Sequence, residues 1–134
     1  MAALTITTIR LVRGDDEHQE TLAANVAVPI TTPMVTQDPT TGNWVLALAT
    51  TTGNLGTPAI ALHVAVAKQA LTAVRAPCIL DLGEALAGLA IGAKVYASDT
   101  AGTLADAAGT VSRVMGTVIG AFASTTADKL LRLE

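Results

Sequence analysis

The sequence predicts an all-β protein, a small β-barrel or β-sandwich module with an extended N-terminal arm and at most one or two short helices. Three observations support this prediction. Candidate strands recur about every 8–12 residues. Within most of them, apolar residues alternate with small or polar ones, as in half-buried strands. Glycine, asparagine and aspartate, which favour turns, separate the segments.

The composition fits one small domain with a core of small and β-branched side chains. Of 134 residues, 26 are alanine and 20 threonine, whereas aromatic residues make up 2%. Eight lysines and arginines against eleven aspartates and glutamates give a net charge of −3. Without a basic excess, binding to nucleic acid through phosphate neutralisation is not expected. The single cysteine, Cys78, excludes an internal disulfide and a zinc site built on several thiolates.

The sequence does not predict a membrane span or a secretion signal. Residues 39–67 carry no lysine, arginine, aspartate or glutamate, but prolines, glycines and threonines interrupt them too often for a spanning helix. The N-terminus lacks a basic start followed by an apolar block and a cleavage site. We therefore expect a soluble intracellular product that does not contact membranes.

The N-terminal part divides into an arm and an acidic run. We expect residues 1–14 to form the extended arm and residues 15–134 a single β-rich domain. The arm is rich in β-branched residues, and its alternation slips at Thr7 and Thr8, which indicates a bulge or a change of partner. The acidic run at residues 15–20 either caps a helical turn through residues 22–24 or forms a solvated loop or short helix face.

The middle of the chain contains a series of period-2 segments. Strands are predicted at residues 26–30, 34–36, 44–49, 59–66 and 71–75. Pro29 places the first of these at a sheet edge. Residues 38–43 are predicted as a turn and residues 50–56 as a polar loop. The alanines of the fourth segment also suit a helix, but its regular alternation favours a strand.

The C-terminal half continues the same pattern. Strands are predicted at residues 78–82, 94–98, 111–123 and 130–133. Gly116 and Gly120 indicate that the third of these is bent, as in a barrel. Residues 84–89 form a helical turn or a loop, and residues 99–103 form a turn.

The sequence offers no convincing catalytic site, so we expect no enzyme activity. Cys78 and His63 could form a nucleophile and its base, but nothing places them together or supplies a third, orienting group. A combination of Ser98 and Asp99 with His18 or His63 is equally weak. A lone cysteine between proline and isoleucine is typical of a small buried apolar residue.

Metal and cofactor sites are not predicted either. Because they are adjacent, the residues Asp15, Asp16, Glu17 and His18 cannot all converge on one ion. Residues 53–57 have two glycines but lack the Gly-Lys-Ser/Thr ending of a phosphate-binding loop. Asp106 is interpreted as a turn or surface carboxylate. Trp44 is interpreted as a core residue, although an interface role stays open.

Residues 83–104 carry the most specific pattern in the chain. Residues 92–98 have the form Gly-x-x-Val-Tyr-x-Ser, and residues 100–104 have the form Thr-Ala-Gly-x-Leu. The strand at 111–118 and the apolar end at 130–133 follow. This order resembles that of capsid decoration (cement) and head-fibre proteins of tailed bacteriophages. Residues 34–47 and 57–63 are more loosely similar, and Pro58 replaces a more usual glycine or small residue there.

The resemblance covers residues 22–133 and implies a structural virion protein. Such a protein binds the outside of the mature phage capsid, bridges neighbouring major capsid proteins and stabilises the shell. It would be made in the bacterial host cytoplasm, commonly as a homotrimer, without nucleic-acid or membrane partners and without cofactors. In this family the N-terminal arm commonly adds to a capsid strand. The residues expected to bind the capsid are Leu4, Thr5, Ile6, Thr7, Thr8, Ile9, Arg10 and Leu11.

Some phage fibre and tail proteins share these glycine turns and this apolar alternation. The alternative function is therefore a fibre or tail-associated adhesion module that binds a host glycan or receptor. Such a module usually stacks sugars on exposed aromatic side chains, so an exposed Trp44 in a groove would favour it.

Overall fold

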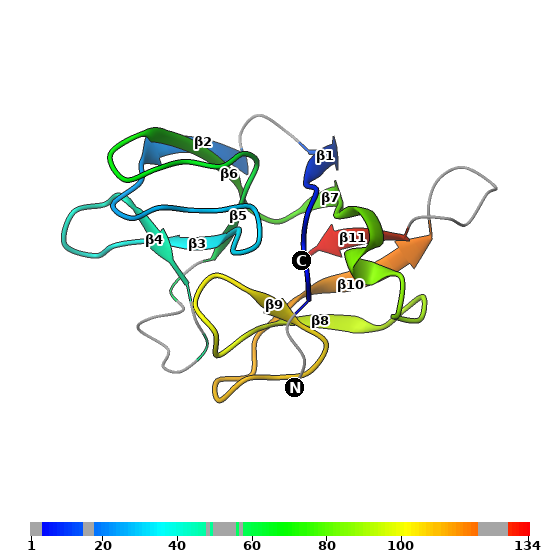
Figure 1. The fold of residues 1–134 in the computed structure, drawn as a ribbon. Helices are drawn as coiled ribbons and strands as arrows, with labels where there is room; N and C mark the ends of the chain where they lie inside the picture. The colour runs from blue at the N-terminus through cyan, green and yellow to red at the C-terminus, as the bar shows by residue number, and fades with distance from the viewer. Residues whose placement is uncertain (1–3, 15–17, 48, 50–55, 57, 121–128) are drawn as a thin grey trace.

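The computed structural model describes residues 4–14, 18–47, 49, 56, 58–120 and 129–134. Within these ranges the chain is almost entirely β and forms two antiparallel sheets (Figure 1). The six-stranded sheet contains, in spatial order, β1 (Arg10–Arg13), β7 (Cys78–Asp81), β11 (Lys129–Leu133), β10 (Val114–Gly120), β8 (Lys94–Ala97) and β9 (Leu104–Ala105). The five-stranded sheet contains β2 (Gln19–Ala23), β6 (Ala70–Val74), β5 (Ala59–Ala61), β3 (Met34–Gln37) and β4 (Trp44–Leu46).

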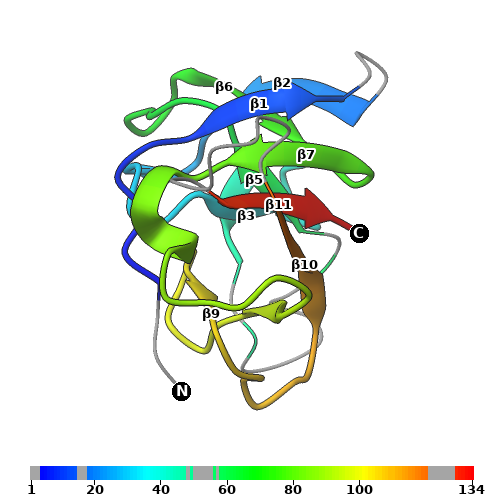
Figure 2. The same cartoon turned by 90° about the vertical axis from the view of Figure 1, so that its right-hand side faces the viewer.

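The predicted all-β class is confirmed. The sheets are not closed into a barrel, and their arrangement is compatible with a β-sandwich (Figure 2). One short 3₁₀ helix, η2 (Gly83–Leu86), follows β7 in the described residues. Within the same residues, no helix has the length and apolarity that a membrane crossing requires.

The main core draws side chains from both sheets. Met34, Ile60 and Val74 lie in register across β3, β5 and β6 and belong to the same buried cluster as Leu80 and Leu131 of the other sheet. Successive strand residues face opposite sides, so their neighbours Val35, Ala61 and Ala73 point to the opposite face. There they form a second cluster with Trp44.

The N-terminal segment, residues 4–13, packs against the rest of the module. The Leu4 backbone N–H donates to the Leu104 carbonyl at 2.8 Å, and Ile6 is fully buried in the main core. Ile9 and Leu11 are partly buried against the same core. β1 then pairs with β7 along the edge of the six-stranded sheet. The described part of the predicted arm is therefore held by the module and is not a free tail.

Most strands lie close to their predicted positions, but several boundaries are corrected. The helical turn considered for residues 22–24 is wrong, because residues 19–23 form the strand β2 and Ala24 forms a β-bridge. Residues 26–30 form no strand and make only a bridge between Val28 and Ala65. The strands predicted at 44–49 and 59–66 end at Leu46 and Ala61, and the strand predicted at 111–123 begins only at Val114. Strand β9 was not predicted. Most of the polar loop predicted at residues 50–56 and the last three residues of the strand predicted at 111–123 lie outside the described ranges.

The predicted turn at residues 99–103 is present and connects β8 to β9. Its backbone closes through the Ser98 N–H, which donates to the Thr103 carbonyl at 3.1 Å. Gly102 has a φ of +74°, and a Cβ there would lie 2.8 Å from the Cβ of Thr32. This position therefore requires glycine both for its conformation and for space.

Candidate interaction surface

Cys78 and His63 do not form a catalytic pair. Cys78 is buried at the start of β7, and burial raises its pKa to about 11, which keeps the thiol protonated at neutral pH. His63 Nε2 accepts a hydrogen bond from the Thr72 N–H at 3.1 Å, and its Nδ1 lies 2.9 Å from the Val64 carbonyl. With Nε2 accepting, Nδ1 carries the proton and donates to that carbonyl. Both ring nitrogens therefore bind the local backbone.

The Ser98–Asp99 pair stabilises turns. The Ser98 hydroxyl oxygen accepts a bond from the Thr100 N–H at 3.0 Å. One carboxylate oxygen of Asp99 accepts from the Thr110 N–H at 2.9 Å, and the other accepts from the Thr110 hydroxyl at 2.8 Å. These contacts tie together the chain before β9 and the chain before β10. They are local contacts of the kind that aspartate and serine make in loops.

Of the weighed metal ligands, only His18 lies within the described residues; residues 15–17 lie outside them. No group of three or more candidate metal-ligating side chains occurs in the part of the chain that the structure describes. Of residues 53–57, only Gly56 is described, and a Cβ at this position would collide with the Thr36 hydroxyl. Asp106 is exposed, as expected of a surface carboxylate.

Trp44 is a core residue. Its side chain is fully buried, and its Nε1 donates to the Leu71 carbonyl at 3.0 Å. The Arg75 guanidinium lies 5.1 Å from the centre of its ring, within range of a cation–π interaction. The indole is therefore unavailable for stacking on a sugar. The feature that would favour a glycan-binding module is absent at this residue.

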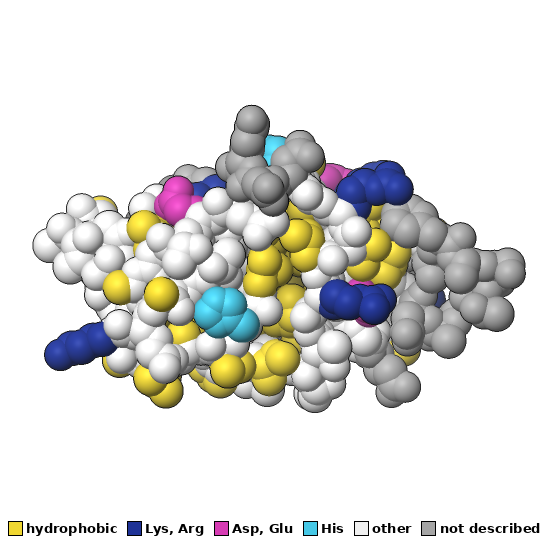
Figure 3. Space-filling model, turned by 90° about the horizontal axis from the view of Figure 1, so that it is seen from above, with side chains coloured by type: hydrophobic (Ala, Val, Ile, Leu, Met, Phe, Trp, Pro, Cys, Tyr) yellow, Lys and Arg dark blue, Asp and Glu magenta, His cyan; other side chains and the backbone are white. Residues whose placement is uncertain are grey.

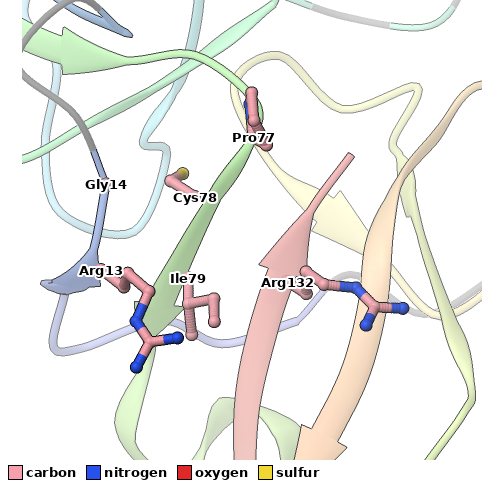
Figure 4. Close-up of a pocket in the computed structure, with 6 residues that line it drawn as sticks. All are labelled: Arg13, Gly14, Pro77, Cys78, Ile79 and Arg132. Carbon is pink, nitrogen blue, oxygen red and sulfur yellow. The ribbon is translucent and has the colours of Figure 1, made fainter.

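A shallow cavity of about 310 Å³ lies beside β1, β7 and β11 (Figure 4). It is lined by Arg13, Gly14, Pro77, Cys78, Ile79 and Arg132. The guanidinium groups of Arg13 and Arg132 extend away from the Cys78 thiol. Arg132 instead lies 3.4 Å from a carboxylate oxygen of Glu134. The cavity therefore lacks polar groups that converge on a ligand.

Within the described residues, most of the exposed large hydrophobic side chains are valines. Val26, Val64 and Val66 are 39%, 56% and 60% exposed. Val64 and Val66 line a hollow of about 430 Å³. Its lining residues are Ala27, Val28, Pro29, Ile30, Val64, Ala65, Val66 and Gln69. We call the exposed side chains of Ala27, Pro29, Val64 and Val66, which line this hollow, the valine patch. Within the described residues, the fourth exposed large hydrophobic side chain is Ile91, on the loop before β8.

Two loops hold the valine patch in place. Val28 and Ala65 exchange backbone hydrogen bonds of 2.8 and 3.2 Å. The Gln69 side chain accepts a bond from the Val66 N–H at 3.0 Å. Lys68 adopts a φ of +73°, and its N–H donates to the Ala24 carbonyl at 2.6 Å. The valines therefore project from a backbone that is hydrogen-bonded on both sides.

Sequence reasoning missed this surface. The alternation at residues 59–66 predicts a half-buried strand. Beyond β5, the small residue Ala65 is buried while the larger Val64 and Val66 face solvent. The alternation itself was the available signal, but it does not say which of the two faces is covered.

The predicted capsid-binding residues have two kinds of environment. Ile6 is buried, and Leu4, Ile9 and Leu11 pack partly against the main core. The exposed members are Thr5, Thr7, Thr8 and Arg10. Arg10 binds Asp81 across β1 and β7 at 2.9 Å. Without rearrangement, a capsid protein could therefore contact this segment mainly through its threonines and Arg10, because Leu4, Ile9 and Leu11 are only partly accessible.

Comparison with known proteins identifies no relative: no family model, no curated protein and no solved structure matches this chain.

Proposed function

We propose that this chain is a structural virion protein that binds the outside of the mature phage capsid. There it bridges neighbouring major capsid proteins and stabilises the shell. The observation that carries this proposal is the valine patch, an uncharged aliphatic surface presented by a hydrogen-bonded backbone. Contiguous exposed apolar surface is typical of protein-binding sites, whose central parts are depleted in charged residues.

The order of elements in the second half also supports the proposal. The segment that resembles decoration proteins runs through η2 and β8, the Gly102 turn and β9. β10 and the terminal strand β11 follow in the order that the resemblance implies. Turns that depend on glycine separate these elements. Their order therefore supports a fold like that of the decoration proteins and, through the resemblance, the function of such proteins.

The mechanism would be mass action. A module that binds only the expanded shell stabilises that shell by its binding free energy. A capsid repeats its surface many times, so a weak contact at each site contributes at every copy. A small aliphatic patch suits this role, because no single contact has to be tight. The N-terminal threonines Thr5, Thr7 and Thr8 would supply a second contact region.

The test is co-sedimentation with expanded capsids, and with unexpanded procapsids, of the virus that encodes the chain. We expect saturable binding to the expanded shell with a fixed copy number. Val66→Glu should weaken this binding at least about tenfold, because it buries a charge against an apolar partner. Ile91→Glu is the matched control: both side chains are 60% exposed, and Ile91 lies on another loop.

Binding that survives Val66→Glu, or that Ile91→Glu weakens equally, would remove the valine patch from the proposal. Failure of the wild-type protein to bind either shell would contradict capsid decoration itself. The adhesion module would then be the function to examine, through binding to glycans and tail proteins.

A further inference from the structure

The outer face of the six-stranded sheet carries basic side chains in one row across five strands. Arg13 of β1 and Arg132 of β11 both pair with Ile79 of β7, one from each side. Arg132 also pairs with Thr117 of β10, which in turn pairs with Lys94 of β8. Residues directly opposite one another in antiparallel strands lie on the same face of the sheet. We call these five residues, Arg13, Ile79, Arg132, Thr117 and Lys94, the basic row.

The basic row faces away from the core. The residues next to it in β7, β11 and β10 are Leu80, Leu131 and Val118, and all three belong to the main core. Successive residues of a strand point to opposite faces, so the row lies on the solvent side. Its three basic side chains are exposed, and the two side chains between them are partly exposed. Seen from above, basic side chains gather at the side of the molecule that carries β1 (Figure 3).

This face is basic in a chain that is acidic overall. The net charge is −3, and the chain has eight lysines and arginines. Four of them lie on this face: the three of the basic row, and Arg10, which pairs with Asp81 at 2.9 Å. Asp81 and Glu134 are the described carboxylates on the same face. Half of the basic side chains of the chain are therefore concentrated on one face of one sheet.

The basic row already binds one carboxylate, that of Glu134. The Glu134 Oε1 accepts a hydrogen bond of 2.8 Å from the Thr117 hydroxyl and lies 3.4 Å from the Arg132 guanidinium. The hydrogen bond from Thr117, together with the charges of Arg132 and Lys94, lowers the pKa of Glu134. The part of the row between Arg132 and Lys94 therefore favours an ionised carboxylate.

The other end of the row contains the cavity of about 310 Å³ beside Arg13, Ile79 and Arg132. Figure 4 shows Ile79 between the two arginines, with Arg132 extending over β10. The polar groups of this cavity do not converge, so it does not suit a small ligand. A longer ligand that crosses the row can instead place an apolar group on Ile79 and a charged group beside each arginine.

The spacing of the basic residues matches an extended chain. They occupy every second strand, and neighbouring strands lie about 4.8 Å apart, so successive basic positions are about 10 Å apart. In a polyproline II helix, every third residue returns to the same side after about 9.3 Å. We propose that the basic row binds an extended acidic segment of a partner protein, which crosses the strands and presents an aspartate or glutamate at every third residue.

The chemistry of the row favours protein carboxylates over nucleic acid. Arginine binds carboxylates through two parallel N–H donors, and the row already holds Glu134 in this way of charge pairing. Three basic residues would neutralise few phosphates, and the carboxylates of Asp81 and Glu134 on the same face would repel a phosphate backbone. The row is also separate from the valine patch, whose loops connect strands of the five-stranded sheet. The proposal therefore does not depend on capsid binding.

The test is the binding of a fluorescent synthetic peptide of repeated Glu-Pro-Pro units, measured by fluorescence anisotropy at low salt. Proline holds this peptide in the extended helix and places a glutamate at every third residue. We expect saturable binding with a Kd below about 1 mM, which weakens as salt is added. A peptide of repeated Gln-Pro-Pro units has the same backbone without the charges, and it should bind at least about tenfold more weakly.

Charge reversals in the protein locate the binding site. Lys94→Glu and Arg132→Glu should each weaken binding of the glutamate peptide at least about threefold, because each turns an attraction into a repulsion. Lys68→Glu is the matched control for Lys94→Glu: both lysines are exposed and the change in net charge is the same, but Lys68 lies before β6 in the other sheet. Glu134→Gln should strengthen binding about twofold, because it removes the carboxylate that competes for Arg132.

Circular dichroism confirms that each variant is folded. The proposal would be overturned if the wild-type protein did not bind the glutamate peptide, or if Lys68→Glu weakened binding as much as Lys94→Glu. Equal binding of the glutamine peptide, or weaker binding by Glu134→Gln, would also contradict it. A thymidine oligonucleotide that bound as tightly as the peptide would show that the row selects no protein segment. All of these measurements use the isolated protein, so their outcome is independent of the capsid test.

Discussion

At the scale of single residues, Gly116 shows how closely two strands approach. It lies in β10 opposite Leu133 of β11, next to a register shift between β10 and β8. A Cβ at Gly116 would overlap the backbone carbonyl of Arg132. A backbone atom cannot move aside as the end of a flexible side chain can. The close approach of β10 and β11 is therefore possible only because residue 116 has no side chain.

Gly116→Ala should lower the free energy of unfolding by about 2 kcal/mol or more, because the added methyl group forces β10 and β11 apart. Gly120→Ala is the control in the same strand, since nothing lies within 4 Å of a Cβ there. That variant should change stability by less than about 1 kcal/mol. Urea unfolding of both proteins measures the difference. Equal unfolding midpoints would show that β11 accommodates the methyl group.

At the scale of elements, the N-terminal segment combines two environments. Its backbone is extended and its threonines face solvent, as a recruiting arm would require. Ile6, however, is fully buried with residues from both sheets. Deletion of the segment would therefore change capsid binding and module stability together. Point substitutions separate the two effects.

Ile6→Ala should destabilise the module by about 2–4 kcal/mol, the usual cost of emptying a buried aliphatic site. Thr7→Ala, the exposed neighbour, should stay within about 0.5 kcal/mol of the wild type. Chemical denaturation of the two variants provides the comparison. If Ile6→Ala were as stable as Thr7→Ala, the segment would not be packed on the module in solution.

Local patterns were sufficient to predict some elements and insufficient for others. β3, β6, β7, β8 and β11 lie within about two residues of their predicted positions. Their alternation or apolar content reflects burial, and turn residues mark their ends. Residues 26–30 and 62–66 alternate equally well but form loops in which Val26, Val64 and Val66 are exposed. Alternation indicates two unlike faces, and only the tertiary structure decides which face is covered.

For the same reason, the sequence could not predict the valine patch. Its side chains look like core residues, and their exposure depends on where β5 ends and on the bridge between Val28 and Ala65. Trp44 is the opposite case. A single tryptophan in an aromatic-poor chain was interpreted as core packing, and its buried position confirms this interpretation.

At the scale of the whole molecule, one core joins the two sheets. Ile60 and Val74 from one sheet pack in the same cluster as Leu80 and Leu131 from the other. Neither sheet can lose this cluster without exposing the apolar face of its partner. The two sheets should therefore unfold together, as small domains usually do.

Two probes already present in the chain test this cooperativity. Trp44 reports on the five-stranded sheet through its fluorescence, and Cys78 reports on the six-stranded sheet through thiol labelling. Burial and the raised pKa of about 11 protect Cys78 in the native state, so labelling at pH 8 should follow unfolding. At one protein concentration, both probes should give the same denaturant midpoint. Separate midpoints would mean that the sheets unfold as independent units.

The edge strands of the two sheets limit what the molecule can build. In the language of polymer chemistry, a unit needs two reactive ends to propagate a chain. A protein with two open sheet edges could grow into fibres at high concentration. Here Leu4 covers the edge of β9, and the bridge between Ala24 and Trp44 joins β4 to the end of β2. A bulge interrupts β1, so none of the four edges among the described strands is open along its whole length.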